Sequence, residues 1–172
     1  MNMQDNNAYD KPAEGAKPGE RFNHIENPKR TQAEMSLEFE RLTAAKTCEN
    51  LAGSFSYLFS ANRMVEVAEL FAHTDTDKIT MPYGVYHGAD AADRCFVQDM
   101  VDIDDPDPVR HEELKGRMII PDMCTPIVEV AGDCKTAKGL WNSPGLEAHS
   151  QNGTGKGWWT WSKFAMDFIL TY

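Results

Sequence analysis

Residues 117–142 read RMIIPDMCTPIVEVAGDCKTAKGLWN, and this stretch decides the fold class. Its first half is rich in β-forming side chains, although two prolines interrupt it. The Gly132-Asp133 pair then supplies the backbone dihedral angles that a tight hairpin turn requires. Residues 136–142 are the predicted returning strand. The stretch therefore predicts an antiparallel hairpin rather than part of a parallel βαβ unit.

Helices are predicted before this hairpin. Apolar residues recur at steps of three and four between Leu42 and Phe59, which is typical of one helix face and predicts a long helix over about residues 32–61. Asp90 is the expected N-cap of a later helix, because its carboxylate can accept from free backbone N–H groups. The other elements expected here are a short helix at residues 64–71, two strands at residues 78–81 and 84–87, and the later helix at residues 90–100.

Two loops and a final strand are predicted from local composition. Residues 99–113 are acidic and contain two prolines but no glycine, which favours a solvated connector over a calcium-binding loop. Residues 143–156 are rich in Gly, Ser and Asn and are predicted to form a flexible loop. Residues 158–172 are predicted to form a long aromatic strand.

These elements predict one α+β domain over residues 31–172. A curved antiparallel or mixed sheet forms its C-terminal half, and three helices in the N-terminal half are expected to close over an internal apolar pocket. Residues 1–30 have few apolar side chains to offset the entropy lost on ordering, so we expect them to form a flexible arm or a tail that clasps another copy in an oligomer. A length of 172 residues suits one domain with a substantial core.

The charge balance narrows the class of partner. The formal net charge is −10, which opposes electrostatic binding to nucleic acid or to anionic lipid. No apolar run approaches the ~20 residues that cross a bilayer, and the N-terminus carries no hydrophobic segment of the secretory kind. We therefore expect a cytoplasmic protein with no membrane and no nucleic-acid partner.

Cofactor signatures are missing from the sequence. The four cysteines are widely spaced and form no CxxC pair, so we expect free thiols and no metal site. The motifs GxGxxG, Walker A, HExxH and GxSxG do not occur. The sequence therefore predicts no cofactor.

Four segments carry a resemblance to a known family. They are VEVAELF at residues 65–71, MPYGVYHG at 81–88, TPIVEVAGDCKTAKGLW at 125–141 and WSKFAMDFI at 161–169. In this order they resemble the SnoaL-like group of the nuclear transport factor 2-like superfamily, and the similarity spans about residues 35–172. The resemblance implies a cone-shaped sheet and a homodimer or higher homo-oligomer that packs through the outer sheet face. Relatives usually continue with one further strand, which the residues given lack, so that the sheet either keeps a bare edge, receives the strand from another chain, or is cut short. Because this superfamily includes cyclases, dehydratases, isomerases, lyases and non-catalytic binding proteins, the reaction type stays open.

The resemblance also implies where acid–base residues would lie. Enzymes of the family pair a carboxylate or tyrosine near the first helices with a histidine on a central strand, since proton transfer needs a group that titrates near neutral pH. The matching positions fall near Ser60 and Pro121, and neither residue can replace that pair.

Nearby residues are the candidate substitutes. Tyr57 could donate a hydrogen bond to a ligand carbonyl, or be a core tyrosine. Asp122 could act as an acid or base if it pointed inward, although strand alternation relative to Pro121 favours the solvent side. His149 could reach over the pocket mouth from the predicted loop, or be exposed there.

Four apolar residues are the candidate ligand contacts. Alternation along a strand places Trp159 and Trp161 on one face and Trp158 on the other. Indoles on the concave face would favour a flat aromatic ligand, whereas the alternative is a core or an oligomer interface. The full set of expected ligand contacts is Trp141, Trp159, Trp161 and Met123.

The first hypothesis for function is a domain that binds a small hydrophobic or aromatic molecule. If it is an enzyme, we expect cofactor-independent lyase, dehydratase, cyclase or isomerase chemistry, with Tyr57 and Asp122 as the catalytic candidates. The alternative is a non-catalytic ligand-binding or assembly module that has lost the acid–base pair.

Overall fold

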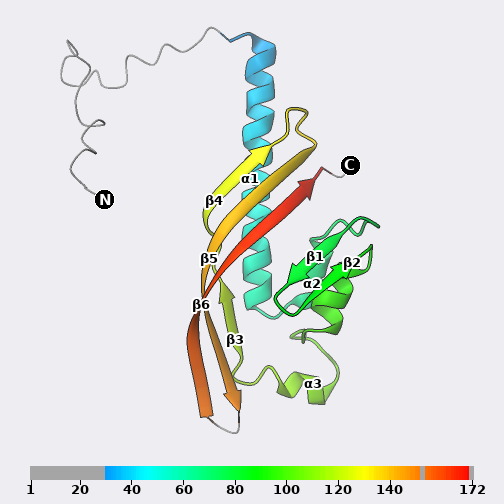
Figure 1. The fold of residues 1–172 in the computed structure, drawn as a ribbon, viewed down its shortest axis with the longest axis vertical. Helices are drawn as coiled ribbons and strands as arrows, with labels where there is room; N and C mark the ends of the chain where they lie inside the picture. The colour runs from blue at the N-terminus through cyan, green and yellow to red at the C-terminus, as the bar shows by residue number, and fades with distance from the viewer. Residues whose placement is uncertain (1–29, 152–153, 171–172) are drawn as a thin grey trace, which may run out of the picture. The chain divides into compact units, whose positions relative to one another are not determined.

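A computed structural model describes residues 30–151 and 154–170, and it confirms the α+β fold class. The helices and a two-stranded hairpin come first in the chain, and a four-stranded antiparallel sheet follows them (Figure 1). The chain divides into two units, residues 1–38 and 39–172, which are described separately. The predicted arm over residues 1–30 lies, apart from its last residue, outside the described residues.

The long helix α1, Gln32–Ser60, confirms the helix predicted over residues 32–61. In the first unit it begins with a capping box: the Glu34 N–H donates to the Thr31 hydroxyl at 3.2 Å, and the Thr31 N–H donates to the Glu34 carboxylate at 2.7 Å. In the second unit the helix buries the apolar face that its spacing predicts, formed by Cys48, Ala52, Phe55 and Phe59.

Two short helical turns and a hairpin follow α1. Helix α2 is Met64–Glu69, and the hairpin pairs β1, Lys78–Met81, with β2, Gly84–His87, as predicted. The later helix is a π-helical turn, η2, at Asp93–Gln98, which packs beside α2. Asp90 precedes the helical residues as predicted, and its backbone carbonyl accepts from the Arg94 N–H at 3.0 Å. The predicted side-chain cap is not formed, because the Asp90 carboxylate accepts from the Arg94 guanidinium at 3.0 Å.

The acidic segment is not a free connector, because it contains helix α3, Pro108–Glu112. The Asp107 carboxylate accepts from the Val109 N–H at 2.9 Å, and a proline occupies the first turn, where its missing N–H costs nothing. Local N-capping therefore starts a helix where composition alone indicated a loop.

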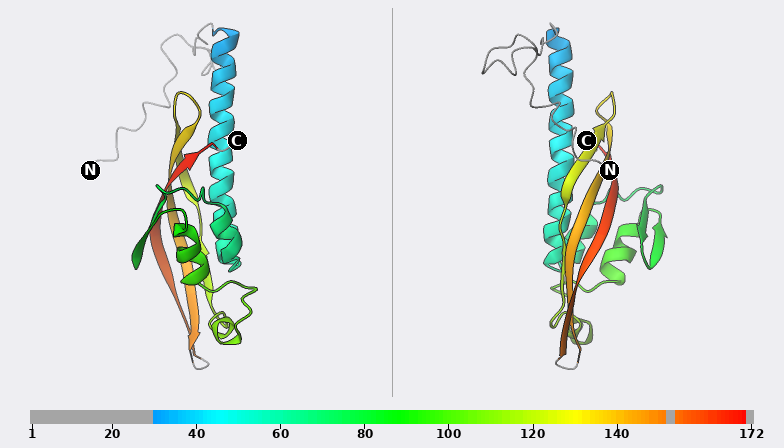
Figure 2. Two further views of the ribbon diagram at one scale, coloured as in Figure 1. Left: turned by 90° about the vertical axis from the view of Figure 1, so that its right-hand side faces the viewer. Right: turned by 60° about the vertical axis from the view of Figure 1, so that its left-hand side comes forward.

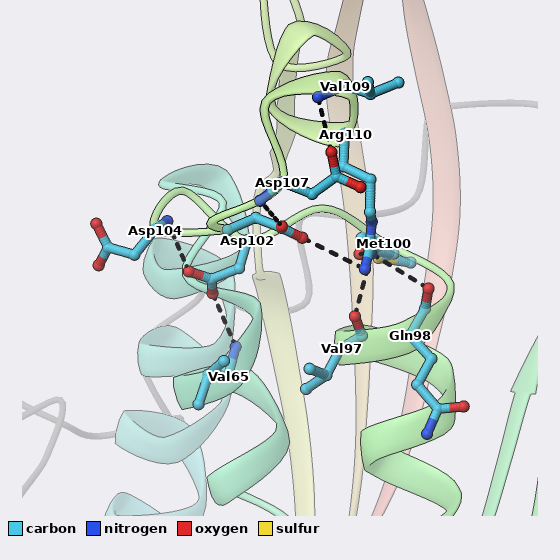
Figure 3. A network of polar contacts seen from close by, with 10 residues as sticks. Val65, Val97, Gln98, Met100, Asp102, Asp104, Asp107, Val109 and Arg110 are labelled. Atoms are coloured by element: carbon cyan, nitrogen blue, oxygen red, sulfur yellow. Dashed lines mark hydrogen bonds and ion pairs between the residues drawn. The ribbon is translucent and has the colours of Figure 1, made fainter.

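The same segment holds the neighbouring helical turns together (Figure 3). The Asp102 carboxylate accepts from the Val65 N–H at 3.0 Å in the first turn of α2. The Arg110 guanidinium forms an ion pair with Asp105 at 3.3 Å and donates to carbonyls at the C-terminal end of η2, those of Val97, Gln98 and Met100. The segment thus supplies hydrogen bonds that the ends of α2 and η2 lack.

The sheet is built around one long strand, β5, Thr136–Gln151. Strands β3, Met118–Pro121, and β4, Cys124–Val130, pair with one edge of β5, and β6, Thr154–Ile169, pairs with the other. The predicted β4–β5 hairpin is confirmed, because the Ala131 N–H donates to the Thr136 carbonyl at 2.9 Å across the turn.

The loop predicted over residues 143–156 is wrong. Strand β5 continues through Ser150 and pairs residue by residue with β6. Gly145 favoured a loop, but a Cβ atom there would lie 2.6 Å from the Thr160 Oγ1 atom and 2.7 Å from the Ile120 carbonyl oxygen. This glycine therefore permits close approach of neighbouring strands rather than ending one.

Five phenylalanines form the centre of the core. The second unit's part of α1 runs along one face of the sheet (Figure 2). The ring centroids of the phenylalanines lie 5.3 to 6.3 Å apart, mostly in tilted or edge contacts, at Phe55, Phe59, Phe71, Phe96 and Phe164. The space in which an internal pocket was expected thus holds packed aromatic side chains.

Gly139 is predicted to be essential for this packing. A Cβ atom there would lie 2.2 Å from the Trp141 ring and 3.1 Å from Phe168, so Gly139→Ala must displace buried rings. We expect it to lower the free energy of unfolding by about 1–3 kcal/mol in urea titration. Gly53→Ala is the control: nothing lies within 4 Å of its Cβ position in α1, so we expect a gain of about 0.5–1 kcal/mol. Equal stability of Gly139→Ala and the parent chain would contradict the packing described.

Candidate functional site

The two catalytic candidates do not meet at an enclosed site. Tyr57 is 81% exposed on α1, and Asp122 is exposed between β3 and β4. The contact between α1 and β3 is made by the preceding residue in each case: the Ser56 hydroxyl donates to the Pro121 carbonyl at 2.6 Å. Since neighbours on a helix or strand point in different directions, Tyr57 and Asp122 are turned away from the core.

Two of the candidate ligand contacts belong to the core. Trp141 is only 2% exposed, and its ring meets Phe168 edge-on at 6.0 Å. Met123 is half-buried against the phenylalanine cluster. These side chains pack against the protein's own core residues.

The other two candidate ligand contacts, Trp159 and Trp161, lie on the face of the sheet opposite to Trp141. We call this face the outer face. Trp159 is 82% exposed and Trp161 is 74% exposed, and they pair across the strands with Leu146 and Pro144. The alternation predicted for Trp158, Trp159 and Trp161 follows from this register. The indoles of Trp159 and Trp161 are therefore free to contact another molecule.

His149 lies on β5 rather than in a loop. Its imidazole stacks on the Trp158 indole with ring centroids 5.3 Å apart and an interplanar angle of 14°. The pair lies on the sheet face opposite to Trp159 and Trp161. This contact could not be predicted from sequence patterns, because it depends on strand pairing within the segment predicted as a loop.

A cluster of phenol, thiol and carboxylate groups surrounds η2 and was not predicted. The Tyr86 hydroxyl donates to the Asp99 carboxylate at 2.5 Å, and the Arg94 guanidinium lies 6.0 Å from the Tyr86 ring centroid. π-helical turns are frequent at functional sites. Both tyrosines of the cluster, Tyr83 and Tyr86, fall within the MPYGVYHG segment. This segment was therefore the sequence signal that could have indicated the cluster.

The protonation of this cluster limits its chemistry. The hydrogen bond to Asp99 raises the pKa of Tyr86 to about 12, and burial raises the pKa of the Cys95 thiol to about 11. The pKa of Tyr83 is also raised, mainly by desolvation of its hydroxyl, although its ring is largely exposed. At neutral pH these groups are protonated hydrogen-bond donors, and none is a ready base or nucleophile.

An open hollow of about 430 Å³ lies at one end of the sheet, beside the β4–β5 turn. It is lined by Glu129, Val130, Ala131, Thr136, Ala137, Lys138, Asp167, Phe168 and Ile169. Within the described residues, no group of three or more His, Cys, Asp or Glu side chains could hold a metal ion. In that same part of the chain, no helix is long and apolar enough to cross a membrane.

Comparison with known proteins gives a structural likeness only. No family model matches the chain, and no curated protein matches it. Its structure is similar to that of an NTF2-like protein with a cystatin-like fold from Novosphingobium aromaticivorans, solved at 1.16 Å. The TM-score is 0.54, the match covers 80% of each chain, and the sequence identity is 12%. This likeness establishes the fold and leaves the activity to be argued from the residues.

The Tyr86–Asp99 hydrogen bond predicts a loss of stability in base. Because the folded-state pKa of Tyr86, about 12, exceeds the ordinary value of about 10, its stabilising effect is complete below pH ~10 and is lost as the pH rises towards ~12. We expect the melting temperature to fall across this range, and to fall less steeply in Tyr86→Phe. Tyr57→Phe, at an exposed tyrosine, is the matched control and should follow the parent chain. Identical profiles for Tyr86→Phe and the parent would show that this hydroxyl contributes nothing.

Proposed function

We propose that this chain is a SnoaL-like domain that binds a small, flat hydrophobic or aromatic molecule. The observation that carries the proposal is the pair of exposed indoles, Trp159 and Trp161, side by side on the outer face. Large exposed apolar side chains that lie together are typical of interaction sites, and indoles stack readily on flat rings. The NTF2-like fold and the four resembling segments support the same assignment.

Binding without catalysis agrees best with the positions of the ionisable groups. A cofactor-independent lyase, dehydratase, cyclase or isomerase needs an acid or base held against its substrate. Tyr57 and Asp122 are exposed on separate elements, and the phenols and thiol beside η2 have raised pKa values. We therefore favour the non-catalytic alternative over the enzyme.

Self-assembly is the second candidate function, and a separate observation favours it. Ile127 and Leu140 lie opposite each other on the outer face and are both exposed. Trp161 and Pro144 form a second apolar pair on this face, separated from Ile127 and Leu140 by the Asn142–Lys163 pair. Burial of such a surface against a second copy would stabilise a homodimer, by roughly 25 cal/mol for each Å² of apolar area removed from water, before the entropy cost of association.

Tryptophan fluorescence can test the binding proposal. With naphthol as the probe, we expect saturable quenching, and about three- to tenfold weaker binding in Trp159→Ala or Trp161→Ala, because each loses one stacking contact. Trp158→Ala is the matched control, since Trp158 faces the other side of the sheet. Unchanged affinity in both outer-face variants would remove these indoles from the binding site.

Sedimentation velocity can test the assembly proposal. We expect the parent chain to form a dimer at micromolar concentration and Ile127→Lys to be a monomer, because the substitution places a charge in the apolar surface. Tyr57→Lys, at an exposed helical position, should remain dimeric. A parent chain that stays monomeric at all concentrations would exclude assembly through this face. It would not contradict the proposal that the face binds naphthol.

A further inference from the structure

We propose that the open hollow beside the β4–β5 turn is a second binding site, which takes a small zwitterionic molecule with an apolar side chain, of the amino-acid class. Its volume of about 430 Å³ suits such a ligand, since pockets for small molecules generally measure ~300–1,000 Å³. The site is separate from Trp159 and Trp161, which do not line the hollow.

A row of alternating charges crosses the hollow. Lys138 on the central strand β5 pairs with Glu129 on β4 and with Asp167 on β6, so the three side chains share one sheet face. All three are exposed, and none takes part in the ion pairs formed among the described residues. One ammonium and two carboxylates therefore retain their hydrogen-bonding capacity for a ligand.

This order of charges selects a zwitterion. Neighbouring strands lie about 4.8 Å apart, which is close to the spacing over which one molecule can present a carboxylate and an ammonium group. The ligand carboxylate would bind the Lys138 ammonium, and the ligand ammonium would bind Asp167 or Glu129. A ligand with only a negative charge would be repelled by the two flanking carboxylates. A ligand with only a positive charge would be repelled by the Lys138 ammonium.

On the face that carries the charged row, the hollow is also lined by Thr136 and Ile169, whereas Val130, Ala137 and Phe168 alternate towards the other face. Ile169 lies next to the charged row, opposite Thr136, and is exposed to an incoming side chain. The hollow's rim is fixed from two sides, because the Arg41 guanidinium donates to the Val130 carbonyl at 3.2 Å and the Leu170 N–H donates to the Lys135 carbonyl at 2.9 Å. Fixing the rim reduces the ordering cost of binding.

Titration by NMR with three related probes tests the charge requirement. L-phenylalanine carries both charges, phenethylamine carries only the ammonium, and phenylpropionate carries only the carboxylate. For phenylalanine we expect saturable shifts at Glu129, Lys138 and Asp167, with a Kd on the order of 1 mM, as befits a small ligand in an open site. The two singly charged probes should bind about tenfold more weakly or not at all. Equal binding of all three, or no saturable shift with phenylalanine, would overturn the proposal.

Variants locate the site within the row. Lys138→Met and Asp167→Asn should each weaken phenylalanine binding about tenfold, because each removes one charged hydrogen bond. Lys163→Met is the matched control, since this lysine lies on the same face of β6 but does not line the hollow. Loss of affinity in the control, or none in Lys138→Met with its fold intact by circular dichroism, would show that the ligand binds elsewhere. Naphthol binding at Trp159 and Trp161 is measured in parallel, so failure at one site is distinguished from failure at the other.

Discussion

The unbroken register between β5 and β6 determines which side chains of the sheet are buried. Sixteen residue pairs connect Thr136–Gln151 with Thr154–Ile169. Because side chains alternate, this register turns Trp141 and Phe164 towards α1 and turns Trp159 and Trp161 outward. A shift of one residue would exchange the two sets, burying polar groups such as Lys163. The core and the outer face depend on this pairing, and so does the position of Asp167 beside Lys138 in the charged row.

Local patterns in the sequence predicted the elements that local interactions form. The apolar steps of α1, the β1–β2 hairpin and the β4–β5 turn all correspond to the observed structure. The strand through residues 143–151 could not be predicted in this way. Gly145 is a glycine because Thr160 and Ile120 leave no room for a side chain there, and both residues are distant in sequence. Helix α3 was missed for a different reason: its Asp107 cap lies within a run of acidic residues that resembles a solvated loop.

The candidate site was predictable only in part. Alternation correctly separated Trp158 from Trp159 and Trp161, but it could not show which face meets the helices. That choice depends on Phe164 and Met166 packing against the core that α1, α2 and η2 form, and so on tertiary structure. The Tyr86–Asp99 hydrogen bond likewise joins a strand to the end of a helical turn, which no sequence spacing revealed.

The π-helical turn η2 also limits changes in the number of residues in this part of the chain. A π-turn accommodates an extra residue compared with an α-turn, so loss of one residue from Asp93–Gln98 would allow ordinary α-helical hydrogen bonding. Because the wider turn takes up that residue, its loss would move the side chains within the turn itself. Cys95 and Phe96, both buried, could not then keep their places beside Phe55 and Phe71. Evolution of this protein should therefore accept amino-acid substitutions in this turn far more readily than insertions or deletions.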